Sequence, residues 1–181
     1  MSRRADMFLE PGQDPREQGA TSLGDEKATL VEFIRYQRAT LVMKCAGLDA
    51  EQLARRAVPP STMSLLGLVR HLADVERGWF QQILGGRDVP GIYRTGPDSD
   101  GDFDGAVADD AVVAQAWADL AAEQAWADAY IAAADDLGAV TDYHHGRISL
   151  REVLVHIVEE YARHNGHADL LREQIDGRIG E

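Results

Sequence analysis

Hydrophobic residues recur at three- and four-residue steps in several long stretches of the chain, the spacing that places them on one side of an α-helix. The pattern predicts helices over residues 25–46, 62–84, 109–135 and 149–176. A further short helical turn is expected near 50–55, before Pro59 and Pro60 interrupt the chain. Because no strand pattern stands out, we expect an all-α fold, a four-helix bundle with a long loop between its second and third helices.

The last of these helices has clear signals at both ends. Ser149 and Glu152 have the spacing of a capping box, and Gly177 suits the left-handed conformation that follows a last helical turn. At about 1.5 Å per residue, this helix would be about 40 Å long. It is therefore expected to run the height of the domain.

The hydrophobic side of that helix also carries charge. Glu160 and His164 fall among the hydrophobic positions, and His156 and His167 flank Glu160 on the same side. Burying an ionised carboxylate is costly unless a cation or hydrogen bonds compensate it. Glu160 and His164 are one turn apart, so both side chains can converge on one point. A divalent metal would account for this arrangement, and a buried, hydrogen-bonded Glu–His pair is the alternative.

The second predicted helix carries one histidine and one unusual glutamate. His71 lies at the edge of the hydrophobic side, a position more typical of a hydrogen-bonded boundary residue than of a metal ligand. A bundle could nevertheless turn it toward Glu160 and His164. Glu76 lies among the hydrophobic positions but points away from His71. We therefore expect Glu76 to form a buried salt bridge or a subunit contact.

Residues 85–105 lack helical periodicity. Within them Asp100, Asp102, Asp104 and Gly105 are spaced like the first half of a calcium-binding loop. The twelfth position of such a loop requires a glutamate, and Ala111 stands there instead. We interpret this stretch as a solvated loop of the kind that often borders a site.

Other reactive side chains are interpreted as structural or exposed. Cys45, near the end of an amphipathic helix, is expected to be a small core residue. The adjacent His144 and His145 precede the last helix, where a surface turn is expected. Neither feature predicts a second site.

Composition limits the domain count and the partners. The 181 residues predict one domain over 25–181, preceded by an extended arm over 1–24 that mixes proline, glycine and charge without periodicity. The net charge of −13 argues against nucleic acid or an anionic membrane as a partner. The single cysteine permits no intrachain disulfide and fits a reducing compartment. Since no apolar signal segment or membrane span is seen, we expect a cytoplasmic protein.

The chain resembles the DinB-like (YfiT-like) metalloenzyme superfamily. Three stretches carry the resemblance: EFIRYQRATLVMKCAGL (32–48), SLLGLVRHLADVERGWF (64–80) and SLREVLVHIVEEYARHNGHADLLRE (149–173). The His-Leu pair of the second stretch and the Glu-x-x-x-His-x-Gly element of the third are its most specific parts. The resemblance covers most of residues 25–177.

The resemblance implies a divalent metal, usually zinc or nickel, held by one histidine of the second helix and two residues one turn apart on the fourth. Carried over to this chain, these ligands are His71, Glu160 and His164. Many relatives have histidine at the position of Glu160, whereas mycothiol-dependent maleylpyruvate isomerase is similar in having glutamate. His167 stands where many relatives have glutamine. We expect it to orient a ligand or accept a proton; a fourth metal ligand is the alternative.

The same resemblance implies a metal-dependent enzyme that uses a low-molecular-weight thiol of the mycothiol type. We expect an S-transferase or a thiol-assisted isomerase acting on small electrophiles. A metal-dependent hydrolase with His167 as proton shuttle, and a non-catalytic metal-binding stress-response module, are the alternatives. Arg70, Arg147 and Arg163 could meet acid groups of the thiol, although solvated helix ends are the favoured interpretation. A homodimer is expected from the resemblance and from the apolar excess of the first and third helices.

Overall fold

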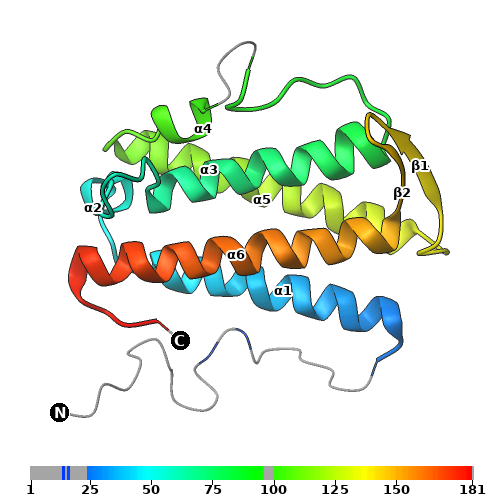
Figure 1. Ribbon diagram of the computed structural model, residues 1–181, viewed down its shortest axis with the longest axis horizontal. Helices are drawn as coiled ribbons and strands as arrows, with labels where there is room; N and C mark the ends of the chain where they lie inside the picture. Colours follow the sequence, from blue (N-terminus) through cyan, green and yellow to red (C-terminus); the bar gives the residue numbers. More distant parts are fainter. Residues whose placement is uncertain (1–13, 15, 17–23, 96–99, 181) are drawn as a thin grey trace.

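The computed structural model describes residues 14, 16, 24–95 and 100–180 and is mostly helical (Figure 1). The elements, in chain order, are α1 (Glu26–Cys45), α2 (Ala50–Ala54), α3 (Leu65–Glu76), η2 (Arg77–Leu84), α4 (Gly101–Asp104), α5 (Asp110–Ala133), β1 (Val140–Tyr143), β2 (Gly146–Ser149) and α6 (Leu150–Asp176). None of the helices in the described ranges is long and apolar enough to cross a membrane. The predicted arm over 1–24 lies almost entirely outside the described residues.

The long helices lie side by side, and the chain runs one way in α1 and α6 and the opposite way in α3 and α5 (Figure 1). Helix α1 packs against α6, and α3 packs against both α5 and α6. Since α3 and α5 share a direction, the connection between them must return along the length of the molecule. This requirement explains the long loop that the sequence predicts between the second and third helices.

The predicted helical stretches are confirmed. The largest difference is at the start of the second helix, predicted at 62 and observed at Leu65 after its N-cap Ser64. At the start of α6, the Ser149 hydroxyl accepts from the Glu152 N–H, and the Glu152 carboxylate accepts from the Ser149 N–H. Gly177 ends that helix with a φ of 81°. The helices meet in a core of fully buried side chains that includes Leu41, Leu66, Leu72, Phe80, Leu154 and Ile157.

A two-stranded antiparallel hairpin, β1 and β2, corrects the expectation of a purely helical chain. Each strand has 4 residues, and Ile148 is the one buried side chain in either strand. The alternation of buried and exposed positions was therefore too short to predict a strand. His144 and His145 are exposed at the turn, as expected for a surface turn. Gly146 follows with a φ of 123°, which favours glycine.

The second predicted helix changes its winding partway. From Arg77 to Leu84 it is a π-helix, and the Gly85 N–H donates to the Phe80 carbonyl at 2.9 Å. The residue types do not change at this point, so the sequence held no signal for it. A π-helical segment rotates the side chains that follow it, and such segments are frequent at functional sites.

Among the described residues of 85–105, the interpretation as a solvated loop is wrong for two parts, which pack on α3. Asp74 on α3 accepts from the backbone N–H groups of Ile92, Tyr93 and Arg94. Further along, α4 forms a helical turn in which Asp102 is 1% exposed. The partners that hold this connection lie on α3, far away in the sequence, and so could not be identified from the loop itself.

Candidate metal centre

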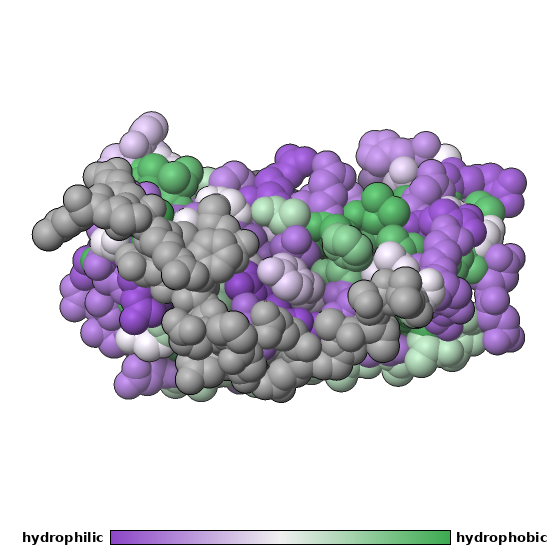
Figure 2. All heavy atoms as spheres, turned by 90° about the horizontal axis from the view of Figure 1, so that it is seen from below, coloured by the Kyte–Doolittle hydropathy of each residue, from purple (hydrophilic) through white to green (hydrophobic). Residues whose placement is uncertain are grey.

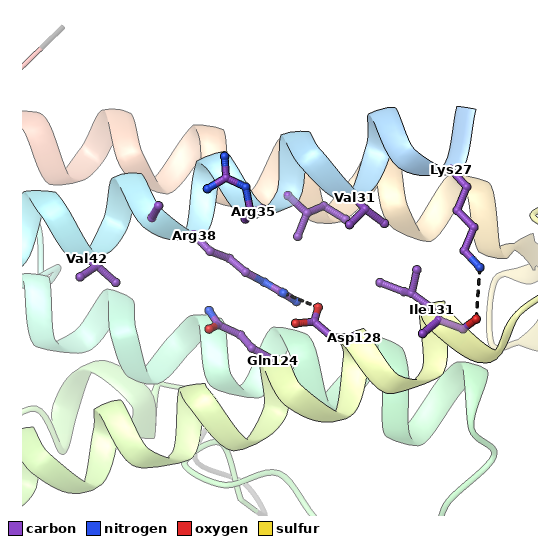
Figure 3. Close-up of a pocket in the computed structure, with 11 residues that line it drawn as sticks. Lys27, Val31, Arg35, Arg38, Val42, Gln124, Asp128 and Ile131 are labelled. Carbon is purple, nitrogen blue, oxygen red and sulfur yellow. Dashed lines mark hydrogen bonds and ion pairs between the residues drawn. The ribbon is translucent and has the colours of Figure 1, made fainter. Parts of the chain in front are cut away.

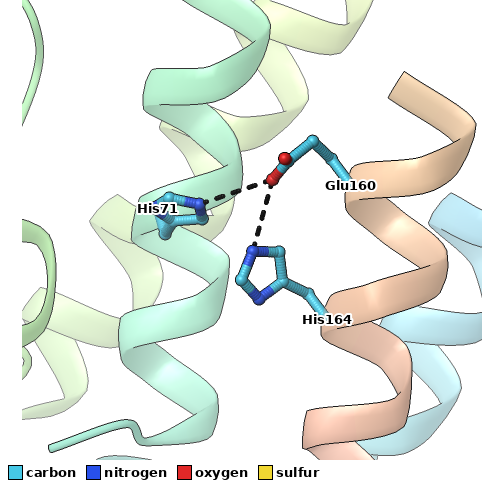
Figure 4. A group of neighbouring side chains, drawn as sticks. All are labelled: His71, Glu160 and His164. Atoms are coloured by element: carbon cyan, nitrogen blue, oxygen red, sulfur yellow. Dashed lines mark ion pairs between the residues drawn. The ribbon is translucent and has the colours of Figure 1, made fainter. Parts of the chain in front are cut away.

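His71 on α3 and Glu160 and His164 on α6 point toward one another (Figure 4). The Glu160 Oε2 atom lies 3.4 Å from the His164 Nε2 atom and 3.8 Å from the His71 Nε2 atom. One donor atom from each side chain can be chosen so that all lie within 4.8 Å of one another. The structure thus brings together the three residues that the sequence had singled out.

The two helices create this convergence through their regular geometry. Glu160 and His164 are one turn apart, so both project from the same side of α6. Helix α3 packs against that helix and carries His71 between the buried Arg70 and Leu72. His71 and Glu160 are partly buried, and His164 is 8% exposed. The cluster therefore lies at the edge of the core.

Asp102 contacts the ring of His71, and sequence reasoning missed this residue. Its Oδ2 atom lies 2.8 Å from the His71 Nδ1 atom, so the other ring nitrogen, Nε2, is the one that faces Glu160. The acidic tract containing Asp102 was noticed for its calcium-like spacing. That arrangement is not seen, because Asp102 faces His71 while Asp104 pairs with Arg56.

Within the cluster, carboxylates and imidazoles shift one another's pKa values toward the charged forms. Burial lowers the pKa of His71, but the hydrogen bond with Asp102 and the proximity of Glu160 outweigh burial and raise it to about 9. The imidazole of His164, followed by that of His71, holds the pKa of Glu160 well below its usual range. Glu160 is thus an ionised carboxylate that attracts positive charge.

The three side chains fit a divalent ion by donor type and by spacing. Two imidazole nitrogens and one carboxylate oxygen form a donor set found in catalytic zinc sites. Metal–ligand bonds of about 2.0–2.1 Å in a tetrahedral site separate neighbouring donors by about 3.3–3.4 Å. The observed 3.4 and 3.8 Å are close to that separation and longer than ordinary N–H···O hydrogen bonds. The two distances to Glu160 are thus near those of a metal site, whereas the three donor atoms together span up to 4.8 Å and would have to move closer to bind one ion.

His167 lies on the far side of His164 from Glu160. Its Nδ1 atom is 3.3 Å from the His164 Nδ1 atom, whereas the His164 Nε2 atom faces Glu160. Burial, followed by the nearby His164, lowers the pKa of His167. His167 is therefore placed to orient the His164 ring.

Aromatic rings border the cluster beside Glu160. The His156 Nε2 atom lies 3.7 Å from the Glu160 Oε1 atom, and the Trp79 ring centre is 4.8 Å from that of His156. The Tyr143 ring is 6.0 Å from that of Trp79. Sequence reasoning placed His156 near Glu160 but missed Trp79 and Tyr143. These two rings come from the π-helix and from the hairpin, neither of which had a sequence signal.

The other residues considered in the sequence analysis either lie away from the cluster or make contacts that stabilise the fold. Arg70 is buried and donates to the Gly101 and Asp102 carbonyls, so the interpretation as a solvated helix end is wrong for it. Arg147 and Arg163 are exposed, near Asp142 and Glu159 respectively. Cys45 is 5% exposed, and burial raises the pKa of its thiol to about 12, as suits a core residue. Glu76 forms the predicted buried salt bridge, with Arg38.

The mostly helical chain is one of the DinB-like (YfiT-like) proteins. More particularly, residues 29–177 match the family model of mycothiol-S-transferase, and the chain belongs to that family. The fold is also similar to that in the crystal structure of a conserved protein from Enterococcus faecalis. That structure has a TM-score of 0.65 and 15% sequence identity, and the match covers 86% of this chain and 99% of the other. Among curated proteins, none matches this chain significantly in sequence.

Proposed function

We propose that the chain is a cytoplasmic, metal-dependent S-transferase that joins mycothiol to small electrophiles. In this proposal a four-helix bundle holds one divalent ion, zinc or nickel, through His71, Glu160 and His164. The family match supports the thiol, and the spacing of the three donors supports the metal. The spacing of the donor atoms of His71, Glu160 and His164 is the observation on which the proposed metal dependence rests.

Three protein ligands leave room for a further ligand, as catalytic sites require. A divalent ion held here would lower the pKa of a thiol that binds to it. In the transfer, the thiol sulfur forms a bond to the electrophilic carbon, the leaving group departs with its electron pair, and the thiol proton passes to a base. His167 is the proposed orienting group and proton acceptor, supported by its contact with His164.

The rings of Trp79, Tyr143 and His156 beside Glu160 offer a surface on which the electrophile could bind. Trp79 and His156 are only partly buried and lie on the Glu160 side of the cluster. A flat or apolar electrophile that stacks on these rings would lie beside the reacting sulfur. This position follows from the proposed location of the metal.

The test is a conjugation assay with monochlorobimane as the electrophile. Metal-free protein is reloaded with zinc or nickel and assayed with mycothiol, cysteine or glutathione. We expect thiol consumption that depends on both metal and mycothiol and that is lost in Glu160→Gln. Equal rates with and without protein would contradict the transferase, and consumption of ester substrates without thiol would favour the hydrolase.

We further propose that the chain forms a homodimer through the face shared by α1 and α5. A cavity of about 510 Å³ lies between these helices, with Val31, Val42 and Ile131 on its apolar walls and Arg38 bound to Asp128 at 2.7 Å across it (Figure 3). Val31 and Val42 are 37% and 52% exposed. Figure 2 shows the face on which α1 lies, with hydrophobic side chains gathered on part of it.

Light scattering at micromolar concentration tests the dimer. Val42→Glu is expected to give a monomer, because it places charge on the proposed interface. Val155→Glu on α6 is the matched control, since Val155 is 51% exposed, and it is expected to leave the dimer intact. A monomeric wild type would contradict the proposal.

A further inference from the structure

Helix α4 reaches His71 with a side chain that is completely enclosed. Asp102 is 1% exposed, and its carboxylate meets the His71 Nδ1 atom at 2.8 Å. The neighbouring Asp104 belongs to the same turn but is exposed and pairs with Arg56 at 2.7 Å. Of these two carboxylates, only Asp102 is directed into the protein.

Arg70, the residue before His71, fixes the backbone on which Asp102 stands. Its guanidinium donates to the Asp102 carbonyl at 2.7 Å and to the Gly101 carbonyl at 2.9 Å. The same guanidinium lies over the Tyr93 ring, 3.8 Å from its centre. Two consecutive residues of α3 therefore hold α4: Arg70 binds its backbone, and His71 binds its carboxylate.

Phe103 adds a packing contact to this arrangement. Its ring stacks on His71 with centres 5.7 Å apart. It also lies directly against Gly67, one turn before His71, where an added Cβ atom would stand 2.5 Å from the Phe103 ring. Glycine at 67 is therefore required for α4 to approach α3 this closely.

We propose that Asp102 is a positioning residue of the metal centre, held in place by Arg70 and Phe103. A carboxylate at Nδ1 makes that nitrogen a hydrogen-bond donor, so Nε2, which faces Glu160 and His164, is the nitrogen that can bind a metal once it loses its proton. It also fixes the rotation of the ring. Helix α4 is in this way part of the proposed metal centre. This inference rests on the proposed metal ligation by His71.

Zinc titration into the metal-free protein tests the proposal. Asp102→Ala is expected to weaken zinc binding about 10–100-fold, the range for loss of a partner that orients a metal-binding histidine. Asp102→Asn keeps an acceptor for the Nδ1 proton and is expected to retain part of the affinity. Asp104→Ala, on the same turn, is the matched control and should bind zinc as the wild type does. Wild-type affinity in Asp102→Ala would overturn the proposal.

A second measurement separates positioning from a general effect on folding. In the metal-free wild type, NMR should show a His71 Nδ1 proton that is protected from solvent exchange by Asp102. Its loss in Asp102→Ala, with the helical circular dichroism spectrum retained, supports positioning; an unchanged signal contradicts it. If Asp102→Ala does not fold, Gly67→Ala gives the zinc comparison, because it displaces Phe103 without altering a ligand. If the wild type binds no zinc, the proposed function fails, while the Nδ1 proton still tests the role of Asp102.

Discussion

Glu76 and Glu160 both lie among hydrophobic positions of their helices, yet the chain surrounds them differently. Glu76 is fully buried and receives two hydrogen bonds of 2.9 Å from Arg38 and one of 3.0 Å from Tyr161. The Glu160 side chain is 19% exposed, and the imidazole nitrogens of His164, His156 and His71 stand at 3.4, 3.7 and 3.8 Å from it. One carboxylate is hydrogen-bonded on both oxygens by the protein, and the other has only imidazole nitrogens near it at longer distances.

The difference shows how similar sequence features acquire different roles. Around Glu76 the partners come from α1 and α6, and Arg38 also bonds to Asp128 on α5, so the cluster joins all four long helices. Around Glu160, three imidazoles lie near the carboxylate without reaching ordinary hydrogen-bond distance. We therefore assign a structural role to the Glu76 cluster and propose a metal-binding role for the Glu160 cluster.

The largest expected effect is on stability at the Glu76 cluster. Glu76→Ala leaves the Arg38 guanidinium buried without its main partner, which typically costs about 3–5 kcal/mol of unfolding free energy. Chemical denaturation of the metal-free protein measures this. Glu159→Ala, which removes an exposed ion pair with Arg163, is the control and should change stability by less than about 1 kcal/mol. A similarly small change in Glu76→Ala would contradict the structural role.

Changes at the Glu160 cluster should affect metal rather than fold. His71→Ala, Glu160→Ala and His164→Ala are each expected to weaken zinc binding by more than about 100-fold, beyond the range for orienting partners. Their metal-free stabilities should change less than that of Glu76→Ala. Calorimetric zinc titration and denaturation provide the two readouts. Wild-type stoichiometry in all three variants would refute the ligand set.

Metal should also stabilise every variant that keeps His71, Glu160 and His164. Zinc at about 100 times its dissociation constant adds about 2.7 kcal/mol to the unfolding free energy of a protein that binds it only when folded. We expect this gain in the wild type and in Glu159→Ala, and none in Glu160→Ala. Thermal unfolding with and without zinc measures the gain, and an equal gain in Glu160→Ala would indicate that zinc binds elsewhere.

The smallest effect is expected at His167. His167→Gln should retain metal, because His167 contacts the His164 nitrogen that faces away from Glu160. Conjugation activity should change modestly and its pH profile should shift if His167 accepts a proton. A loss of metal as large as in His164→Ala would show instead that His167 is a ligand.

Sequence periodicity could predict the long helices and most of the cluster, because a regular helix determines which residues share a side. Glu160 and His164 follow from one-turn spacing on α6, and the buried salt bridge of Glu76 from its place among hydrophobic residues. Linking His71 to them required the resemblance, since periodicity does not say which helices face each other.

The rest of the site depends on irregular backbone. Asp102 is enclosed only because Arg70 and His71 bind α4, and its neighbour Asp104 has the same side chain and is exposed. Trp79 reaches His156 from the π-helix, and Tyr143 reaches Trp79 from a hairpin with strands of 4 residues. These contacts join segments that are far apart in the chain, so local pattern could not reveal them.

Zinc uptake by three metal-free proteins compared side by side tests the central claim most directly: wild type, Glu160→Gln and Glu76→Gln. Both substitutions replace a carboxylate with an amide of nearly the same shape, so they separate the two clusters. We predict one bound zinc per chain in the wild type and in Glu76→Gln, and none in Glu160→Gln at the same concentration. Equal uptake by the wild type and Glu160→Gln, or no uptake by the wild type, would contradict the account.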